Sequence, residues 1–247
     1  MNQTVLVLGA TSAIAIAYCR RLASEGAAFV LVGRHQERLE TVAADLKARG
    51  AAEALPVISD LANMAFCENR FREFCARVAM PDQVLLAYGM LGDQADAEQD
   101  AEATRRIIDV DFTSAALWLQ MAAKHLPRDK PRSIVVITSV AGDRGRRSNY
   151  VYGAAKAGLA TFAEGLAHRL HGTPLHVLTV KPGFVDTPMT AQFERGGLLW
   201  AQPEQIAADI DKAVRKRKPV AYTPRFWWPI MTVIRLLPRA ILFRTKL

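Results

Sequence analysis

Short apolar runs alternate along the chain with longer segments in which apolar residues recur at helical spacing. The runs predict β-strands at residues 4–8, 28–32, 55–58, 84–87, 134–138, 175–180 and 220–222. The segments between them predict α-helices at residues 13–24, 36–49, 64–78, 101–125, 152–171 and 204–217. Continuous apolar strands separated by amphipathic helices are typical of a parallel sheet covered on both faces. We therefore expect an α/β protein with a doubly wound parallel sheet in residues 1–225.

Polar or small residues follow most of these predicted strands. In open parallel sheets, ligands bind beyond the carboxyl ends of the strands. The residues that we expect to meet at this edge are Gly9, Asp60, Gly89, Ser139, Pro182 and Gly183.

The segment after the first strand has features of a nucleotide site. Residues 9–15 read Gly-Ala-Thr-Ser-Ala-Ile-Ala and lead into an alanine-rich helix. A tight turn into a helix N-terminus presents backbone N–H groups and a positive dipole end to a diphosphate. Thr11 and Ser12 add hydroxyl groups that bind the ligand or cap the helix. An ordinary capped turn explains this segment alone equally well.

The end of the second strand indicates which dinucleotide is bound. Arg34 stands there in place of the acidic residue that usually binds the adenosine ribose, and Arg38 follows one helical turn later. An arginine suits a 2′-phosphate, which a carboxylate would repel. We therefore expect NADPH as the cofactor. The alternative is that Arg34 is an ordinary solvated arginine at the end of a strand and binds no cofactor. Asp60, after the third strand, is placed to receive the adenine amino group.

Tyr152 and Lys156 are the strongest candidates for chemistry. Residues four apart share a helix face, so the lysine ammonium is expected to lie beside the phenol and to lower its pKa from about 10. Ser139 ends an apolar strand and is expected to face Tyr152 across a substrate oxygen. Such a pair can give a proton to a carbonyl. Tyrosine and lysine at this spacing are common on helices, so the pattern becomes specific only beside a nucleotide site.

In this order, these residues resemble the short-chain dehydrogenase/reductase family over essentially the whole chain. The matching residues are Gly9, Asp60, Leu61, Gly89, Ser139, Tyr152, Lys156 and 182–187. The resemblance implies a Rossmann-type fold and an NADPH-dependent oxidoreductase that reduces a ketone to an alcohol by hydride transfer.

The resemblance also implies roles for single residues. Ser139 would position the carbonyl and stabilise the developing oxyanion, and Tyr152 would donate the proton. Lys156 would tune Tyr152 and bind the nicotinamide ribose. Together with Tyr152 and Lys156, the candidate cofactor-binding residues are Gly9, Thr11, Ser12, Ala13, Ile14, Arg34, Asp60, Leu61, Gly89, Pro182, Gly183, Val185 and Thr187.

The chain departs from the family pattern in three places. Ala13 and Ala15 replace glycines of the phosphate-binding turn, and each methyl limits the approach of a phosphate. Residues 86–89 read Leu-Ala-Tyr-Gly instead of Asn-Asn-Ala-Gly. Asp111 stands where the family has a catalytic asparagine. We expect its carboxylate to hold Lys156 in the charged form and to shift the pH optimum of the activity. A non-catalytic nucleotide-sensing or assembly protein therefore remains an alternative.

The basic residues are concentrated at the C-terminal end. The net charge is +8, but residues 212–247 hold ten lysines and arginines and no acid, which leaves residues 1–211 at −2. This favours one local anionic partner over a general nucleic-acid surface. Residues 87–94, 111–114 and the basic apolar tail resemble the branch that reduces keto-sugars carried by polyprenyl phosphate. A lipid-linked or otherwise amphiphilic ketone is the substrate class that this implies.

The tail, residues 226–247, is interpreted as a basic amphipathic segment. Its apolar face at helical spacing comprises Ile230, Val233, Ile234, Leu237 and Ile241. Arg235 and Arg239 take the other face, and charged residues with prolines argue against a membrane span. We expect it to lie at the surface of an anionic membrane. Packing on a neighbouring subunit or over the substrate pocket is an equal alternative.

The remaining features suit a cytoplasmic protein that contacts the membrane only peripherally. The three cysteines lack metal-ligand or redox spacing and are expected to be reduced thiols, and no signal peptide is expected. His125, His168 and His171 lie in helical stretches without a ligand constellation, so no metal is assigned. A homo-oligomer without nucleic acid is expected.

Overall fold

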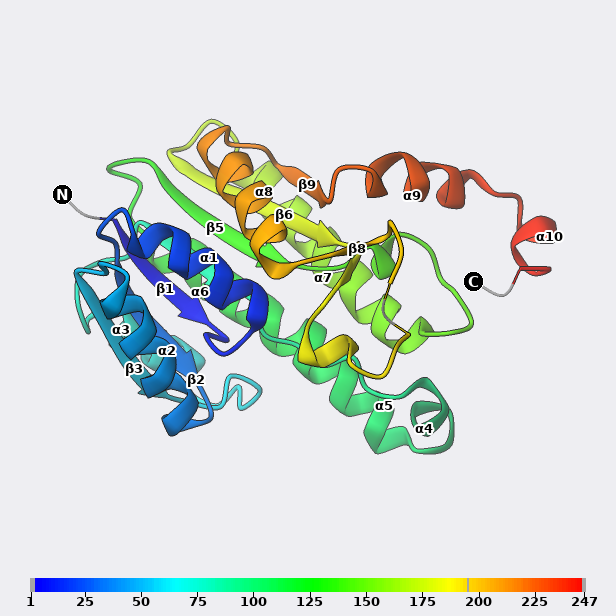
Figure 1. The fold of residues 1–247 in the computed structure, drawn as a ribbon, viewed down its shortest axis with the longest axis horizontal. Coiled ribbons are helices and arrows are strands. Elements are labelled where there is room, and N and C mark those ends of the chain that lie inside the picture. Colours follow the sequence, from blue (N-terminus) through cyan, green and yellow to red (C-terminus); the bar gives the residue numbers. More distant parts are fainter. Residues whose placement is uncertain (1–2, 195, 246–247) are drawn as a thin grey trace.

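The computed structural model describes residues 3–194 and 196–245. Its main sheet has seven parallel strands in the order β3-β2-β1-β4-β5-β6-β9 (Figure 1). The strands are β1 (Thr4–Leu8), β2 (Ala28–Gly33), β3 (Glu53–Ile58), β4 (Gln83–Leu86), β5 (Arg132–Ile137), β6 (Leu175–Pro182) and β9 (Val220–Thr223). The predicted α/β class and doubly wound parallel sheet are confirmed.

Helices cover both faces of the sheet because successive strand residues point to opposite sides. In β1, Val5 and Val7 enter one hydrophobic core, while Leu6 and Leu8 enter the other. The first core is closed by α1 (Ala13–Ala23), α2 (Gln36–Ala48) and α8 (Pro203–Arg215). The second is closed by α3 (Cys67–Cys75), α6 (Ala115–His125) and α7 (Tyr150–Arg169).

The strand order places a switch point between β1 and β4. The chain runs outward from β1 to β3 and then returns to the other side of β1, so the loops after β1 and β4 lie next to each other. Gly9 follows β1 with a φ of +92°, and a Cβ there would lie 2.6 Å from the backbone N of Tyr88. Glycine is required at this point, where ligands of such sheets bind.

The predicted helix at 101–125 is confirmed as a continuous helical stretch, but it contains a π turn that was not predicted. It consists of α5 (Ala101–Ile108), a π-helical turn (Asp109–Ser114) and α6. A π turn inserts extra backbone without disturbing the apolar pattern on either side, so periodicity does not reveal it. The predicted helix at 64–78 is shorter, and the sequence did not predict α4 (Gln94–Gln99) or the small sheet of β7 (Phe184–Val185) and β8 (Trp200–Ala201).

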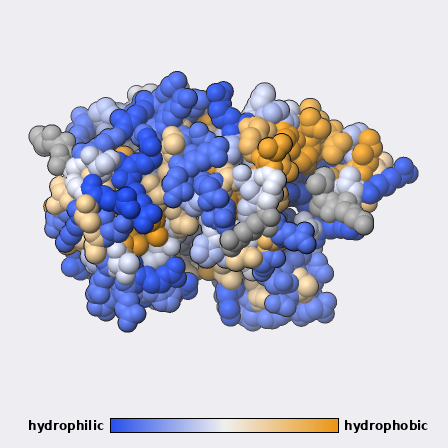
Figure 2. Space-filling model, viewed as in Figure 1, coloured by the Kyte–Doolittle hydropathy of each residue, from blue (hydrophilic) through white to orange (hydrophobic). Residues whose placement is uncertain are grey.

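The tail forms α9 (Trp227–Leu236) and α10 (Arg239–Leu242), which are separated at Pro238. The predicted apolar face was partly wrong. Of its members, Ile230 and Ile234 pack against the buried cluster of Val140, Trp227 and Met231, whereas Val233 and Ile241 are 62% and 52% exposed. Apolar side chains occur on more than one side of α9, so spacing alone does not tell which side packs on the protein. Figure 2 shows hydrophobic residues gathered over this end of the molecule.

Across residues 3–194 and 196–245, no helix combines the length and the apolar character that crossing a membrane requires.

Candidate active site

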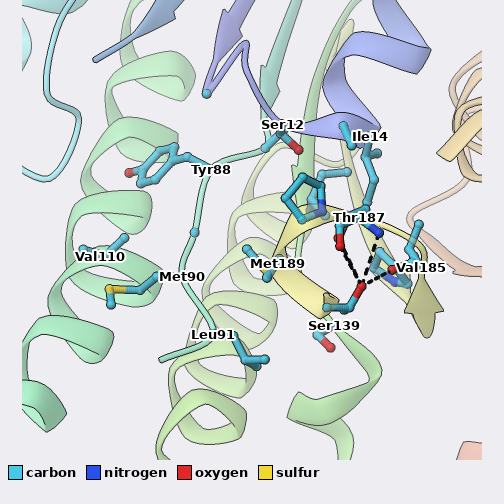
Figure 3. Close-up of a pocket in the computed structure, with 18 of the residues that line it drawn as sticks. Ser12, Ile14, Tyr88, Met90, Leu91, Val110, Ser139, Val185, Thr187 and Met189 are labelled. Atoms are coloured by element: carbon cyan, nitrogen blue, oxygen red, sulfur yellow. Dashed lines mark hydrogen bonds between the residues drawn. The ribbon is translucent and has the colours of Figure 1, made fainter. Parts of the chain in front are cut away.

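A cavity of about 770 Å³ opens at the carboxyl edge of the main sheet, between the loops that follow its strands. The predicted site residues that line it are Gly9, Thr11, Ser12, Ala13, Ile14, Arg34, Asp60, Leu61, Gly89, Ser139, Tyr152, Lys156, Pro182, Gly183, Val185 and Thr187. Asp111 is the one predicted residue that does not line it. Figure 3 shows Ser12 and Ile14 at one end, and Tyr88, Met90 and Leu91 along the segment that follows β4.

The α1 end of the cavity fits a dinucleotide phosphate. Ser12 precedes α1 and its side chain makes no capping hydrogen bond, so the first N–H groups of the helix lack a side-chain partner. Ala13 and Ile14, which carry two of these groups, line the cavity. Arg34 and Arg38 reach the same cavity from the loop after β2 and the start of α2. These donors and cations suit a diphosphate and a 2′-phosphate.

The two alanines that replace family glycines have different positions. Ala15 is fully buried in the hydrophobic core under α1 and does not line the cavity, whereas Ala13 does. Only the methyl group of Ala13 therefore bears on the approach of a phosphate.

Ser139 is brought to Tyr152 by close packing of the 3₁₀ turn Val140–Asp143 on α7. A Cβ on Gly142 would lie 2.7 Å from the backbone N of Ala157, and one on Gly153 would lie 2.9 Å from the carbonyl oxygen of Ala141. Larger residues at either position would separate the turn from the helix. The Ser139 hydroxyl oxygen accepts a hydrogen bond of 3.1 Å from the N–H of Ala141, which orients it.

The pKa of Tyr152 is raised, so the expected downward shift was wrong. Burial is the largest cause, and the Lys156 ammonium, 5.7 Å from the ring centre, opposes it. The Asp111 carboxylate raises the pKa further, and hydrogen bonding with Ser139 lowers it. The sequence predicted the effect of the lysine but could not include the desolvation that exceeds it. Tyr152 is therefore protonated at neutral pH, which is the form of a proton donor.

Lys156 and Asp111 form a buried ion pair, with Nζ and Oδ1 2.9 Å apart. Asp111 also accepts a hydrogen bond from the N–H of Met90 at 3.2 Å, and the π turn carries it into this position. Burial alone would lower the pKa of Lys156, but Asp111 and Tyr152 together more than offset this and the net shift is upward. Burial raises the pKa of Asp111, against the opposing effect of Lys156. Asp111 thus acts through Lys156 and does not reach the cavity itself.

The loop after β7 forms the opposite wall. Thr190 Oγ1 donates a hydrogen bond of 2.6 Å to the carbonyl oxygen of Val185 and accepts one of 3.2 Å from the N–H of Thr187. These are among the dashed lines in Figure 3. They hold Val185 and Thr187 against the cavity.

The lining residues that sequence reasoning missed include Arg106, Arg146, Asn149 and Trp227. Three arginines between Ser139 and Tyr152 were a usable signal for Arg146. Nothing in the sequence indicated that Trp227 packs over Gly183, more than forty residues away.

Across the described ranges 3–194 and 196–245, no group of three or more His, Cys, Asp or Glu side chains could hold a metal ion. Cys19, Cys67 and Cys75 are free thiols.

Known proteins resemble this chain along most of its length. The sequence profile of the short chain dehydrogenase family matches residues 3–196. An uncharacterised oxidoreductase of Mycobacterium tuberculosis is 38% identical over 237 residues, which cover 96% of this chain and 94% of that protein. Cis-4-hydroxycyclohexanecarboxylate dehydrogenase of Sinomonas cyclohexanicum is 29% identical, over 91% of this chain and 84% of that protein.

The fold is also found among solved structures. A short-chain dehydrogenase from Sphingobium yanoikuyae, in complex with NADPH, matches with a TM-score of 0.80 at 24% identity and covers 96% of this chain and 97% of that chain. The profile match and the oxidoreductase relatives, together with this fold, lead to one conclusion: the chain belongs to the short-chain dehydrogenase/reductase family and is an NAD(P)-dependent oxidoreductase.

Proposed function

We propose that the protein reduces a ketone to an alcohol with NADPH, and that Tyr152 supplies the proton. The observation that carries this proposal is the shared cavity of Ser139, Tyr152, Lys156 and the N-terminus of α1. When bound with its phosphates at α1, NADPH supplies the hydride for the carbonyl carbon.

Each side chain then has one task. Ser139 accepts from Ala141, which leaves its own proton available to the carbonyl oxygen. Tyr152 gives its proton to that oxygen as negative charge develops on it. Lys156 stabilises the phenolate that results, since its ammonium already opposes the upward shift in the pKa of Tyr152. Asp111 is a positioning residue because it holds the Lys156 ammonium in place.

The direct test is oxidation of NADPH by purified protein with a panel of ketones that includes lipid-linked keto-sugars. Tight NADPH binding without turnover across the panel would favour the second candidate, a nucleotide-sensing protein on the same fold. The observation behind that candidate is the ion pair between Asp111 Oδ1 and Lys156 Nζ, 2.9 Å apart, because the carboxylate compensates the charge that would stabilise a phenolate.

Replacing Asp111 by asparagine is expected to move the basic limb of the pH–rate profile to lower pH. The Asp111 carboxylate raises the pKa of Tyr152, so its removal lowers that pKa. Reduction needs protonated Tyr152 and is lost as the pH rises through its pKa, so the loss should begin at a lower pH. The profile of kcat/KM against pH measures this. Asp109→Asn, in the same π turn but paired with the exposed Arg105, is the control. An unchanged profile for Asp111→Asn would refute the role of the carboxylate.

Replacing Arg34 by glutamine is expected to reduce the preference for NADPH over NADH by about 10- to 100-fold, the typical worth of a hydrogen bond to a charged group. The ratio of kcat/KM for the two nucleotides measures it. Arg49→Gln, near the C-terminal end of α2 and outside the cavity, removes the same charge and should leave the ratio unchanged. Equal ratios in Arg34→Gln and wild type would remove the basis for the 2′-phosphate assignment.

We propose that the outer side of the tail binds an anionic membrane and presents an amphiphilic or lipid-linked carbonyl substrate to the cavity. Trp228, Leu236 and Phe243 are 60%, 77% and 78% exposed. Arg235 and Arg239 are exposed among them, and residues 212–247 contain no acid. Apolar side chains mixed with cations are the composition that binds anionic bilayer surfaces. Trp227, on the inner side of the same helix, lines the cavity.

The double variant Leu236→Asn and Phe243→Asn is expected to lose cosedimentation with phosphatidylglycerol vesicles. Both side chains are exposed, so the packed side of α9 with Trp227 and Met231 is kept. Phe66→Asn removes an equally exposed phenyl group, 79% accessible, from the N-terminal end of α3 and should bind as wild type does. Wild-type protein that stays in the supernatant would contradict the proposal, and self-association seen instead would assign the surface to a second copy. Homo-oligomerisation itself stays a prediction.

A further inference from the structure

Three residues that line the cavity each carry a buried polar atom without a hydrogen-bond partner. In residues 3–194 and 196–245, four buried side-chain polar atoms are unpaired, and three of them belong to residues that line the cavity. They are Nε of Arg146, Oδ1 of Asn149 and Nε1 of Trp227. Buried polar groups are nearly always hydrogen-bonded, so their concentration in one cavity indicates a polar ligand.

Arg146 and Asn149 line the cavity beside the start of α7, the helix that carries Tyr152. They form one turn, in which the N–H of Asn149 donates to the carbonyl oxygen of Arg146 at 3.3 Å, directly before α7. Arg106, on α5, lines the same cavity, and α5 packs on α7. The cations proposed for the cofactor, Arg34 and Arg38, follow β2 on the other half of the sheet. The two sets of cations thus serve different parts of a bound complex.

The Nε atom of Arg146 donates no hydrogen bond to a carboxylate. Asp143 is the acid that acts on it, but its two oxygens already accept from Lys181 at 2.5 Å and from the Tyr222 hydroxyl at 2.6 Å. Burial lowers the pKa of Arg146, and Asp143 opposes this, yet a guanidinium stays charged at neutral pH. Arg146 is a half-buried cation without a bonded acid at Nε, which favours an anion in the cavity.

We propose that Arg146, together with Arg106 and Asn149, binds an oxyanion carried by the carbonyl substrate, either a carboxylate or a phosphate. The planar guanidinium matches both groups with two parallel N–H donors. The Asn149 amide presents its NH₂ group to the same anion after rotation about its terminal bond. This inference rests on the proposed function, because it assigns a substrate class to the same cavity.

The test is calorimetric binding to full-length protein saturated with NADP⁺, which cannot reduce a ketone. One arm compares 4-oxocyclohexanecarboxylate with its methyl ester and represents a soluble keto acid. The other compares octyl phosphate with octanol and represents a lipid phosphate. In at least one arm, the anion should bind about tenfold or more tightly than its neutral partner. The arm that shows the preference identifies the source of the oxyanion.

Arg146→Met should abolish this preference, and Arg147→Met, at the exposed neighbouring position, should retain it. Asn149→Asp is the second variant, since aspartate is favoured at the helix N-cap that Asn149 occupies and adds a negative charge beside Arg146. It should also abolish the preference. A preference that persists in both variants, or no preference in either arm of the wild type, overturns the subsite. Failure of the wild type to bind NADP⁺ overturns the proposed function instead.

Discussion

Replacing Tyr152 by phenylalanine is expected to lower kcat/KM for ketone reduction by about 10²- to 10⁴-fold, the usual contribution of a positioned general acid. The substitution removes only a hydroxyl group from a ring that is 9% exposed, so the cavity keeps its shape. The residual rate should lose the pH dependence that comes from the phenol. Initial rates of NADPH oxidation across the pH range measure both effects.

Tyr150→Phe is the matched control because Tyr150 also lies in the first turn of α7 but is 46% exposed and outside the cavity. It should reduce ketones at the wild-type rate. Both variants should bind NADPH, measured by nucleotide fluorescence, as wild type does. A Tyr152→Phe enzyme that retains more than about a tenth of the wild-type rate would show that another group donates the proton.

Replacing Gly183 by alanine is expected to destabilise the protein by about 1–3 kcal/mol and to weaken NADPH binding. A Cβ at this position would collide with the indole ring of Trp227. The indole has little room to yield, since it is 4% exposed and packs edge-on against Phe184 with ring centres 5.6 Å apart. Arg144 also holds the end of α9 by donating to the carbonyl oxygen of Leu237 at 3.2 Å.

Gly165→Ala is the matched control, because Gly165 lies inside α7, four residues before its end, and a Cβ there would meet nothing within 4 Å. It should stabilise the protein by about 0.5–1 kcal/mol, since alanine is the better helix former. Urea unfolding midpoints and the Kd for NADPH measure the two variants. Equal midpoints for Gly183→Ala and wild type would mean that α9 does not pack over the cofactor site as described.

The fold and the position of the site follow from local features of the chain. Each strand of the main sheet has an apolar core, and β1 and β5 are buried along their whole length. Parallel strands place their carboxyl ends at one edge, so the sequence predicts that Gly9 and Ser139 meet there. The spacing of Tyr152 and Lys156 likewise needs only a helix.

The remaining features depend on contacts between distant residues. The sign of the shift in the pKa of Tyr152 results from desolvation by the folded protein, which no local pattern encodes. The π turn carries Asp111 beside Lys156, and the apolar pattern of the sequence did not reveal it. The side of α9 that packs inward is set by contacts with Val140 and Gly183.

By itself, the sequence determined the class of fold and the edge of the sheet at which the cavity opens, and it named the residues to which we assign proton exchange. These depend on alternation, spacing and chain direction, which are local properties. Only the tertiary structure decided the direction of the shift in the pKa of Tyr152 and the lining of the cavity by Trp227 and Arg146. Burial and long-range packing set these properties, because electrostatic free energies depend on which groups exclude water from a charge.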